Sequence, residues 1–291
     1  MNTLALLGSS LRQSLRIMTR NKVGFAGLCL TLFIILGAYV APSFVPADLE
    51  AHVEEIYEGP SAKHLLGTDY QGRDTFTQIV HGGRDVIYVA ALAALLTLAI
   101  AVTLGSLAAV LGGWADNLIN AAGELVLTIP HFPLLLVLAG FIRLTSPSAL
   151  ALIIASIGWG SLMRTIRAQV LSLKERDYVQ AARALGLPTS HLLFREIMPN
   201  MMSFILVQFV MSMTGAIYNQ TGLIFLGIIP MVTNNWGVMI NLAWGQGAIF
   251  SKTSTWYLMS PIAIIVLLQF SLISMTRSLD ELFNPRLRVG E

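Results

Sequence analysis

Long apolar runs constrain the fold of this chain more than any other feature of its sequence. Several of them extend for about 20 residues, the length at which an α-helix crosses a hydrocarbon core about 30 Å thick. Charged residues make up 12% of the chain and hydrophobic residues 55%, and the mean hydropathy is +0.70. A soluble domain usually carries about twice this share of charge. The sequence therefore predicts a membrane protein.

Six of these runs are predicted to cross the membrane as helices, because open strands would leave backbone groups unpaired in lipid. Pro130 and Pro133 lie in the third run, and Pro261 lies near the start of the sixth, so kinks or breaks are expected there. The predicted fold class is therefore an all-α membrane protein with six transmembrane helices. The six predicted spans are residues 23–45, 86–111, 119–142, 149–171, 201–229 and 257–275.

Basic residues are distributed unequally between the two sides that these spans define. An even number of spans puts both termini on one side, and 13 of the 18 lysines and arginines fall in the segments on that side. Segments rich in lysine and arginine tend to stay in the cytoplasm. The first run is too long for a secretory signal and lacks a cleavage site. We therefore expect an uncleaved first span and two cytoplasmic termini.

Residues 1–22 have the pattern of an amphipathic helix. Apolar side chains recur at spacings of three and four, and three arginines share another face. A basic amphipathic helix lies along the membrane surface, so we expect an N-terminal interfacial helix, with a disordered basic tail as the alternative. The apolar face contains Leu4, Leu7, Leu11, Leu15 and Met18, and the basic face contains Arg12, Arg16 and Arg20.

The cytoplasmic segment between the fourth and fifth spans has the pattern of two short helices around a turn. The first helix is rich in alanine and ends at Gly186, a frequent residue type at helix ends. Thr189 or Ser190 is expected to cap the second helix after Pro188. This second helix should end before Pro199. A compact basic helix pair suits docking into a groove on a soluble partner, and a plain loop is the alternative.

The same segment resembles the EAA loop of ABC-importer permeases. In that family the loop holds the coupling helix, which sits in a cleft of the ATPase subunit. Glutamine stands here where glutamate is frequent, and the missing charge puts a salt link at this position in doubt. The matching residues are Gln180, Ala181, Ala182, Gly186, Met198 and Pro199.

Two further stretches narrow the resemblance to the C-type permease subunit of the dipeptide/oligopeptide/nickel importer family. The segment before the second span is similar to an external signature of that family, and residues 279–288 are similar to its Asp-Pro-Arg-Leu-Arg ending. Together with the EAA loop, the resemblance extends from about Asn21 to the end of the chain. The external signature consists of Gly67, Thr68, Asp69, Gly72, Arg73 and Asp74, followed by Gly82, Gly83 and Arg84.

The resemblance implies a type I ABC importer permease fold and a bacterial or archaeal inner-membrane location. It also implies a second homologous permease, two ATPase subunits and an external solute-binding protein as partners. ATP and magnesium would then be bound by the ATPases, so this chain is expected to hold no cofactor and to be no enzyme. Di- or oligopeptides are the implied substrates, with oligosaccharides or nickel as alternatives.

The resemblance also divides the chain into regions. Residues 1–22 form the cytoplasmic amphipathic segment, 23–45 the first span and 46–85 an external loop. Residues 86–279 form the permease core of five spans, with a cytoplasmic coupling loop at 174–199, and 280–291 form a cytoplasmic tail.

A polar stripe on the fifth predicted span is the candidate translocation path. Gln208, Ser212, Gly215 and Asn219 recur every three or four residues on one helix face. Polar side chains in membrane helices usually face a bundle interior or a hydrated path, and hydrogen-bonding contacts between helices are the alternative. Gln220 stands where many relatives have an acidic residue, and we expect it on the path as well.

Glu124 is an isolated carboxylate near the cytoplasmic end of the third predicted span, where a charge is costly. It is expected to act at a gate or in an interhelical contact, or else to reach water by extending along the helix.

Other classes of function have weaker support. A free-standing channel or secondary transporter would need no coupling loop and often shows an inverted repeat, whereas an intramembrane enzyme would need paired catalytic residues in its spans. The five histidines are scattered without the spacing of metal ligands, and a single cysteine excludes a cysteine-based zinc site. No basic and aromatic pattern indicates nucleic-acid binding. We therefore expect no catalytic residues, metal site or nucleic-acid partner in this chain.

Overall fold

The computed structural model describes residues 19, 21–47, 50–142, 146–229 and 235–283, and within these ranges it is built of helices. Five helical segments are each long and apolar enough to cross a membrane. They correspond to the first, second, fourth, fifth and sixth predicted spans. Their principal helices are α2 (Lys22–Val40), α3 (Thr75–Leu111), α6 (Pro147–Lys174), α9 (Met202–Phe225) and α11 (Thr255–Phe283).

The third predicted span is not a single helix. It forms α4 (Gly113–Thr128) and α5 (His131–Phe141), which are bent by 84°. The break falls at Ile129 and Pro130, and Ile129 has an extended backbone with φ −91° and ψ 131°. Proline disfavours a helical conformation in the residue before it, which explains why the chain turns here. Six spans result only if this bent pair counts as one.

The second long helix starts well before the predicted span. We expected an external loop over residues 46–85, but α3 begins at Thr75 and is 37 residues long. Asp74 caps it, because its Oδ2 accepts a hydrogen bond from the backbone N–H of Thr77 at 2.7 Å. Residues 75–85 are therefore helical although they precede the apolar run that defined the predicted span.

Small residues allow the helices to approach each other closely. A Cβ at Gly105 of α3 would lie 2.6 Å from the carbonyl oxygen of Met163 in α6. Between α2 and α11, a Cβ at Gly27 would lie 2.6 Å from the Cβ of Ser274. Nearby, Thr31 donates a hydrogen bond to Ser271 at 2.9 Å. Close packing of this kind and interhelical hydrogen bonds hold helices together in lipid.

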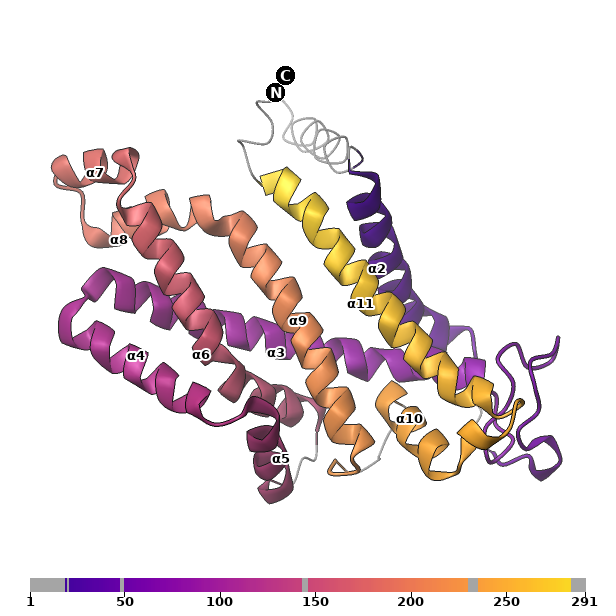
Figure 1. Cartoon of the computed structure of the whole chain (residues 1–291). Coiled ribbons are helices and arrows are strands. Elements are labelled where there is room, and N and C mark those ends of the chain that lie inside the picture. Colours follow the sequence, from indigo (N-terminus) through magenta and orange to yellow (C-terminus); the bar gives the residue numbers. More distant parts are fainter. Residues whose placement is uncertain (1–18, 20, 48–49, 143–145, 230–234, 284–291) are drawn as a thin grey trace.

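The two ends of the bundle differ in what they carry (Figure 1). The start of α2 and the end of α11 lie at the same end as the short helices α7 (Asp177–Ala184) and α8 (Thr189–His191). The loop before α3 and the short helix α10 (Trp236–Gly245) lie at the other end. The expected interfacial helix at residues 1–22 and the tail at 280–291 fall largely outside the described residues.

α10 is packed against the beginning of α3. The indole Nε1 of Trp236 donates a hydrogen bond to the carbonyl of Ile79 at 2.8 Å. A Cβ at Gly83 would lie 2.7 Å from the Trp236 ring, and one at Gly82 would lie 3.0 Å from it. The two glycines of the external signature therefore make room for this tryptophan.

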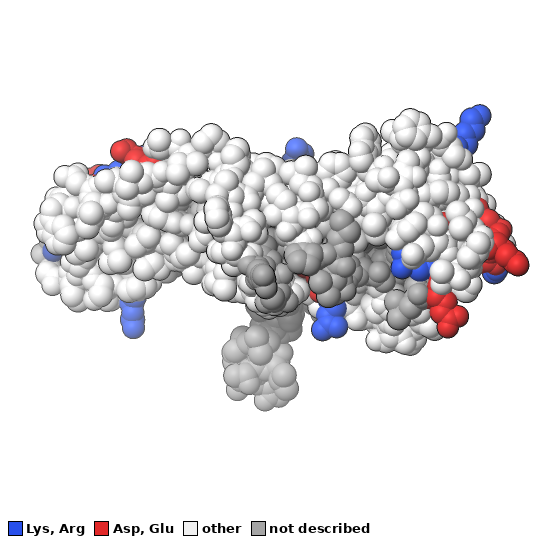
Figure 2. Space-filling model, turned by 90° about the horizontal axis from the view of Figure 1, so that it is seen from below, with Lys and Arg blue, Asp and Glu red and all other residues white. Residues whose placement is uncertain are grey.

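Figure 2 views the whole molecule from below. Most of the visible surface is uncharged, as expected of a chain surrounded by lipid. Acidic side chains gather mainly at the right-hand end, where Figure 1 places the loop before α3.

Candidate functional site

Residues 174–199, the predicted coupling loop, form two helical parts on either side of a turn, as expected. α7 is the first part, and α8 continues into a π-helix (Leu192–Ile197) and a 3-10 helix (Pro199–Met201) that leads into α9. One detail of the expectation was wrong, because Pro188 rather than Thr189 or Ser190 occupies the N-cap position of the second part, without a side-chain hydrogen bond. The π-helix ends at Ile197, before Pro199 as expected, and Pro199 begins the 3-10 helix.

Gly186 forms the turn after α7. Its φ is +74°, in the left-handed region that glycine adopts most easily. Its N–H donates to the carbonyl of Arg183 at 2.9 Å, and the N–H of Leu187 donates to the carbonyl of Ala182 at 3.3 Å. No atom lies within 4 Å of where a Cβ at Gly186 would be. The turn therefore depends on the backbone conformation of Gly186, and the space beside it is open.

The two alanines of the predicted coupling motif differ in exposure. Ala181 is exposed, whereas Ala182 is 7% exposed and packs toward the body of the chain beside the fully buried Val179. Gln180 donates a hydrogen bond from Nε2 to the carbonyl of Lys174 at 3.0 Å, which ties α7 to the end of α6. The neutral amide thus has a partner within its own chain.

Large apolar side chains project from the outer side of the coupling loop. Leu185 is 80% exposed and Phe194 is 68% exposed, and Tyr178 and Pro199 are exposed as well. Met198 is half-buried. We call Tyr178, Ala181, Leu185 and Phe194 the outer face of the loop. Exposed apolar groups at a membrane protein's aqueous end are typical of a contact surface for another protein.

The external signature forms a closed network of hydrogen bonds around Asp69. This side chain is fully buried. Its Oδ1 accepts from the backbone N–H groups of Gln71 at 2.7 Å and Arg73 at 2.9 Å, and its Oδ2 accepts from Gln78 Nε2 at 2.8 Å. The Arg73 guanidinium also pairs with Oδ2, with Nε at 2.9 Å and Nη2 at 2.8 Å. A buried carboxylate with this many partners is satisfied without a ligand.

A second carboxylate links the network to the start of α3. Asp74 caps α3 with one oxygen, and its other oxygen lies 3.0 Å from His64 Nδ1. His64 Nε2 lies 3.2 Å from Glu55, which also pairs with Lys63. The hydrogen bond from Lys63 holds the pKa of Glu55 below its usual value. His64 therefore has a structural position, bridging the loop and the helix.

The remaining signature residues set the path of the loop backbone. Thr68 Oγ1 accepts from the N–H of Glu58 at 2.8 Å and donates to the carbonyl of Glu55. Gly72 has a φ of +78°, and a Cβ there would collide with the carbonyl of His52. Gly67 is similarly crowded by the Glu58 carbonyl. The signature as a whole forms a hydrogen-bonded cap at the start of α3.

The polar stripe of α9 faces a thinly packed side of the chain. Gln208, Ser212, Gly215 and Asn219 are all partly buried, and nothing lies within 4 Å of where a Cβ at Gly215 would be. Asn219 Nδ2 lies 3.3 Å from His131 Nε2, at the start of α5. The stripe therefore borders the break between α4 and α5.

Gln220 does not belong to this stripe. It is fully buried, and its Nε2 donates to the carbonyl of Val86 in α3 at 2.8 Å. One residue on a helix corresponds to a rotation of about 100°, which turns Gln220 toward α3 while Asn219 points elsewhere. Our expectation that Gln220 lines the path is corrected, because in this structure it connects two helices inside the chain.

Two ion pairs connect α4 to α6. Glu124 pairs with Arg164 at 3.1 Å, so the interhelical contact expected of Glu124 is present, although its side chain remains 65% exposed. Asp116 accepts from both Nε (2.6 Å) and Nη2 of Arg167. Sequence reasoning missed Asp116. No local pattern in the sequence marks this pair, since Asp116 and Arg167 are 51 residues apart.

Among the described residues there is no group of three or more histidine, cysteine, aspartate or glutamate side chains that could hold a metal ion.

Comparison with known proteins places this geometry in a family. Residues 101–289 match the binding-protein-dependent transport system inner membrane component, and residues 9–60 match the N-terminal TM domain of oligopeptide transport permease C. The oligopeptide transport system permease protein of Bacillus subtilis (strain 168) is 32% identical over 273 residues, covering 92% of this chain and 87% of that protein. The dipeptide transport system permease protein of the same organism is 32% identical over 277 residues, covering 94% and 85%.

Proposed function

The chain belongs to the binding-protein-dependent transport system inner membrane components, as a C-type permease, and on this premise we propose that it forms half of the path of an ATP-driven peptide importer. Its family is one of transport permeases in the inner membrane. The peptide substrate is supported by two relatives, each 32% identical, whose names specify oligopeptides and dipeptides. Neither of these two names specifies oligosaccharides or nickel.

The proposed assembly contains a second homologous permease, two ATPase subunits and an external solute-binding protein. In this assembly the ATPases bind ATP and magnesium, and the chain itself catalyses no reaction. Closure of the ATPase dimer rocks the helices around a central path, so that the path opens to one side of the membrane at a time. The proposal includes the division of the chain into an external loop, a permease core, a coupling loop and a cytoplasmic tail.

The observation that carries this proposal is the outer face of the coupling loop. Exposed apolar side chains stand on a short helix whose inner side is anchored by the buried Val179 and Ala182. A helix of this kind is suited to a groove on a soluble subunit. Ala181 and Gly186 are the positions where the partner comes close, and Met198 and Pro199 lie where the loop joins α9.

Replacing Leu185 by Asp should disrupt this contact. Desolvating a carboxylate at an apolar interface is costly, and loss of a central contact of about 2 kcal/mol weakens binding roughly 30-fold. The measurement is the amount of ATPase that copurifies with the tagged chain. Leu65→Asp is the matched control, because Leu65 is 60% exposed and lies in the external loop. Equal recovery of ATPase from both variants would contradict the coupling assignment.

Topology can be tested with single cysteines in a Cys29→Ser background. We propose that Glu54 is outside the cell and Arg176 in the cytoplasm, and both residues are exposed. Glu54→Cys should therefore react with an impermeant thiol reagent in intact cells, whereas Arg176→Cys should react only after the membrane is opened. Reaction of both from the same side would contradict an orientation with cytoplasmic termini.

Gln208, Ser212 and Asn219 are proposed to border the translocation path. The open space beside Gly215 supports this assignment over a tight helix contact. Ser212→Phe should then lower peptide uptake at least tenfold while assembly and melting temperature stay near those of the wild type. Met211→Phe is the control, since the neighbouring position faces another direction. If Ser212 instead lies at a helix interface, overpacking would cost about 1–3 kcal/mol, and the complex would come apart in detergent.

A further inference from the structure

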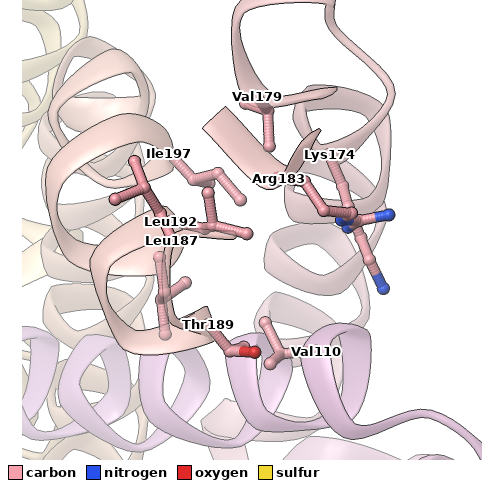
Figure 3. A pocket seen from close by; sticks show the side chains of 9 residues that line it. Val110, Lys174, Val179, Arg183, Leu187, Thr189, Leu192 and Ile197 are labelled. Carbon is pink, nitrogen blue, oxygen red and sulfur yellow. The ribbon is translucent and has the colours of Figure 1, made fainter. Parts of the chain in front are cut away.

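A cavity of about 290 Å³ lies between the coupling loop and the membrane-spanning helices. Its size is near the lower end of the range of ligand pockets, about 300–1,000 Å³. Figure 3 shows Lys174 and Arg183 on the side opposite Leu187, Leu192 and Ile197. The complete lining is Val110, Lys174, Val179, Arg183, Leu187, Thr189, Leu192, Leu193 and Ile197.

The cavity is lined in part by residues at the ends of two apolar helices. Val110 is the penultimate residue of α3, and Lys174 is the last residue of α6. Both helices are apolar enough to span the membrane and end on the side that carries the coupling loop. A cavity between the ends of two spans is therefore a suitable position for a lipid of the adjacent leaflet.

The charged side of the cavity carries only positive groups. Lys174 Nζ donates to the carbonyl of Ala109 at 3.1 Å, and within the described ranges neither Lys174 nor Arg183 forms an ion pair. Two acids of the same loop have partners of their own, since Glu175 accepts a hydrogen bond from Gln180 at 3.4 Å and Glu196 lies 3.6 Å from His191 Nε2. Two cations beside the hydroxyl of Thr189 form a suitable environment for a phosphate group.

We propose that this cavity binds an anionic phospholipid of the cytoplasmic leaflet. The phosphate lies at the rim with Lys174 and Arg183, and an acyl chain lies against the apolar wall. Basic pockets at the cytoplasmic side of spanning helices suit anionic headgroups. The apolar wall favours a lipid over free phosphate, since inorganic phosphate would leave that wall without a partner. A bound lipid would connect the coupling loop to the ends of α3 and α6.

The test uses native mass spectrometry to compare how much phospholipid the wild type and its variants retain. The full-length chain, with the subunits that accompany it, is purified from vesicles containing equal amounts of phosphatidylglycerol and phosphatidylcholine. The wild type should retain phosphatidylglycerol preferentially. Each basic side chain near an anionic surface contributes about fivefold, so Lys174→Gln with Arg183→Gln should weaken retention roughly 30-fold. Arg176→Gln is the matched control, because Arg176 belongs to the same loop but does not line the cavity.

A second variant covers the case in which the double variant fails to assemble. Leu187→Trp fills the cavity without removing charge, and it should also abolish preferential retention. Inorganic phosphate at millimolar concentration should leave the bound lipid in place. Displacement by phosphate, equal loss in Arg176→Gln, or full retention in Leu187→Trp would each overturn the proposal. These measurements do not depend on transport, so their failure would leave the importer assignment unaffected.

Discussion

Gly186→Trp should leave membrane insertion intact and abolish substrate-stimulated ATP hydrolysis in the assembled importer. A left-handed backbone costs residues other than glycine about 1–2 kcal/mol, and Gly186 has a φ of +74°. The indole would also project into the space beside the turn, which no atom of this chain fills. If the ATPase occupies that space, the bulk of tryptophan keeps it at a distance. The measurement is the ATPase rate with and without loaded binding protein.

Gly186→Asn separates the effect of the left-handed backbone conformation from the effect of the bulky indole. Asparagine tolerates the left-handed conformation better than other side chains do, and it is much smaller than tryptophan. It should therefore retain most of the stimulation. Normal stimulation in correctly assembled Gly186→Trp would remove the coupling role from this turn.

Asp69→Ala should be the most destabilising single substitution in the external loop. It would leave the Arg73 guanidinium, Gln78 and two backbone N–H groups without their acceptor in a buried place. Removing one partner of a buried ion pair costs about 3–5 kcal/mol. We expect a clear fall in the melting temperature of the purified chain and faster proteolysis of the loop before α3.

Glu54→Ala is the control for this effect. Glu54 lies in the same loop but is exposed, and substitutions at such positions usually change stability by less than about 0.5 kcal/mol. If Asp69→Ala has the same melting temperature as Glu54→Ala and the wild type, the fold of the signature does not depend on this carboxylate.

The spanning helices could be predicted because the thickness of the membrane sets their length and lipid requires them to be apolar. The start of α3 could not be placed in this way, since its first turns lie beyond the apolar run. The cap by Asp74 was the local signal for it. The break at Pro130 was predictable from proline chemistry, but its 84° angle depends on the packing of α5 against its neighbours.

The candidate site was predictable to different degrees. The turn at Gly186 followed from local helix-ending rules, which act within a few residues. The burial of Ala182 and the contact of Gln220 with Val86 depend on tertiary packing. Helical periodicity alone already separated Gln220 from the stripe. The pairing of Asp116 with Arg167 joins positions 51 residues apart, and neither residue indicates the other locally.

The most direct test of the proposed function is peptide uptake by the reconstituted importer. The chain, the second permease, the ATPases and the binding protein are placed in vesicles, and ATP is supplied on the side of the coupling loop. We predict that a labelled peptide accumulates only when ATP and the binding protein are both present, and that Gly186→Trp abolishes this accumulation. Equal uptake without ATP would contradict the proposal and would indicate a free-standing channel or secondary transporter.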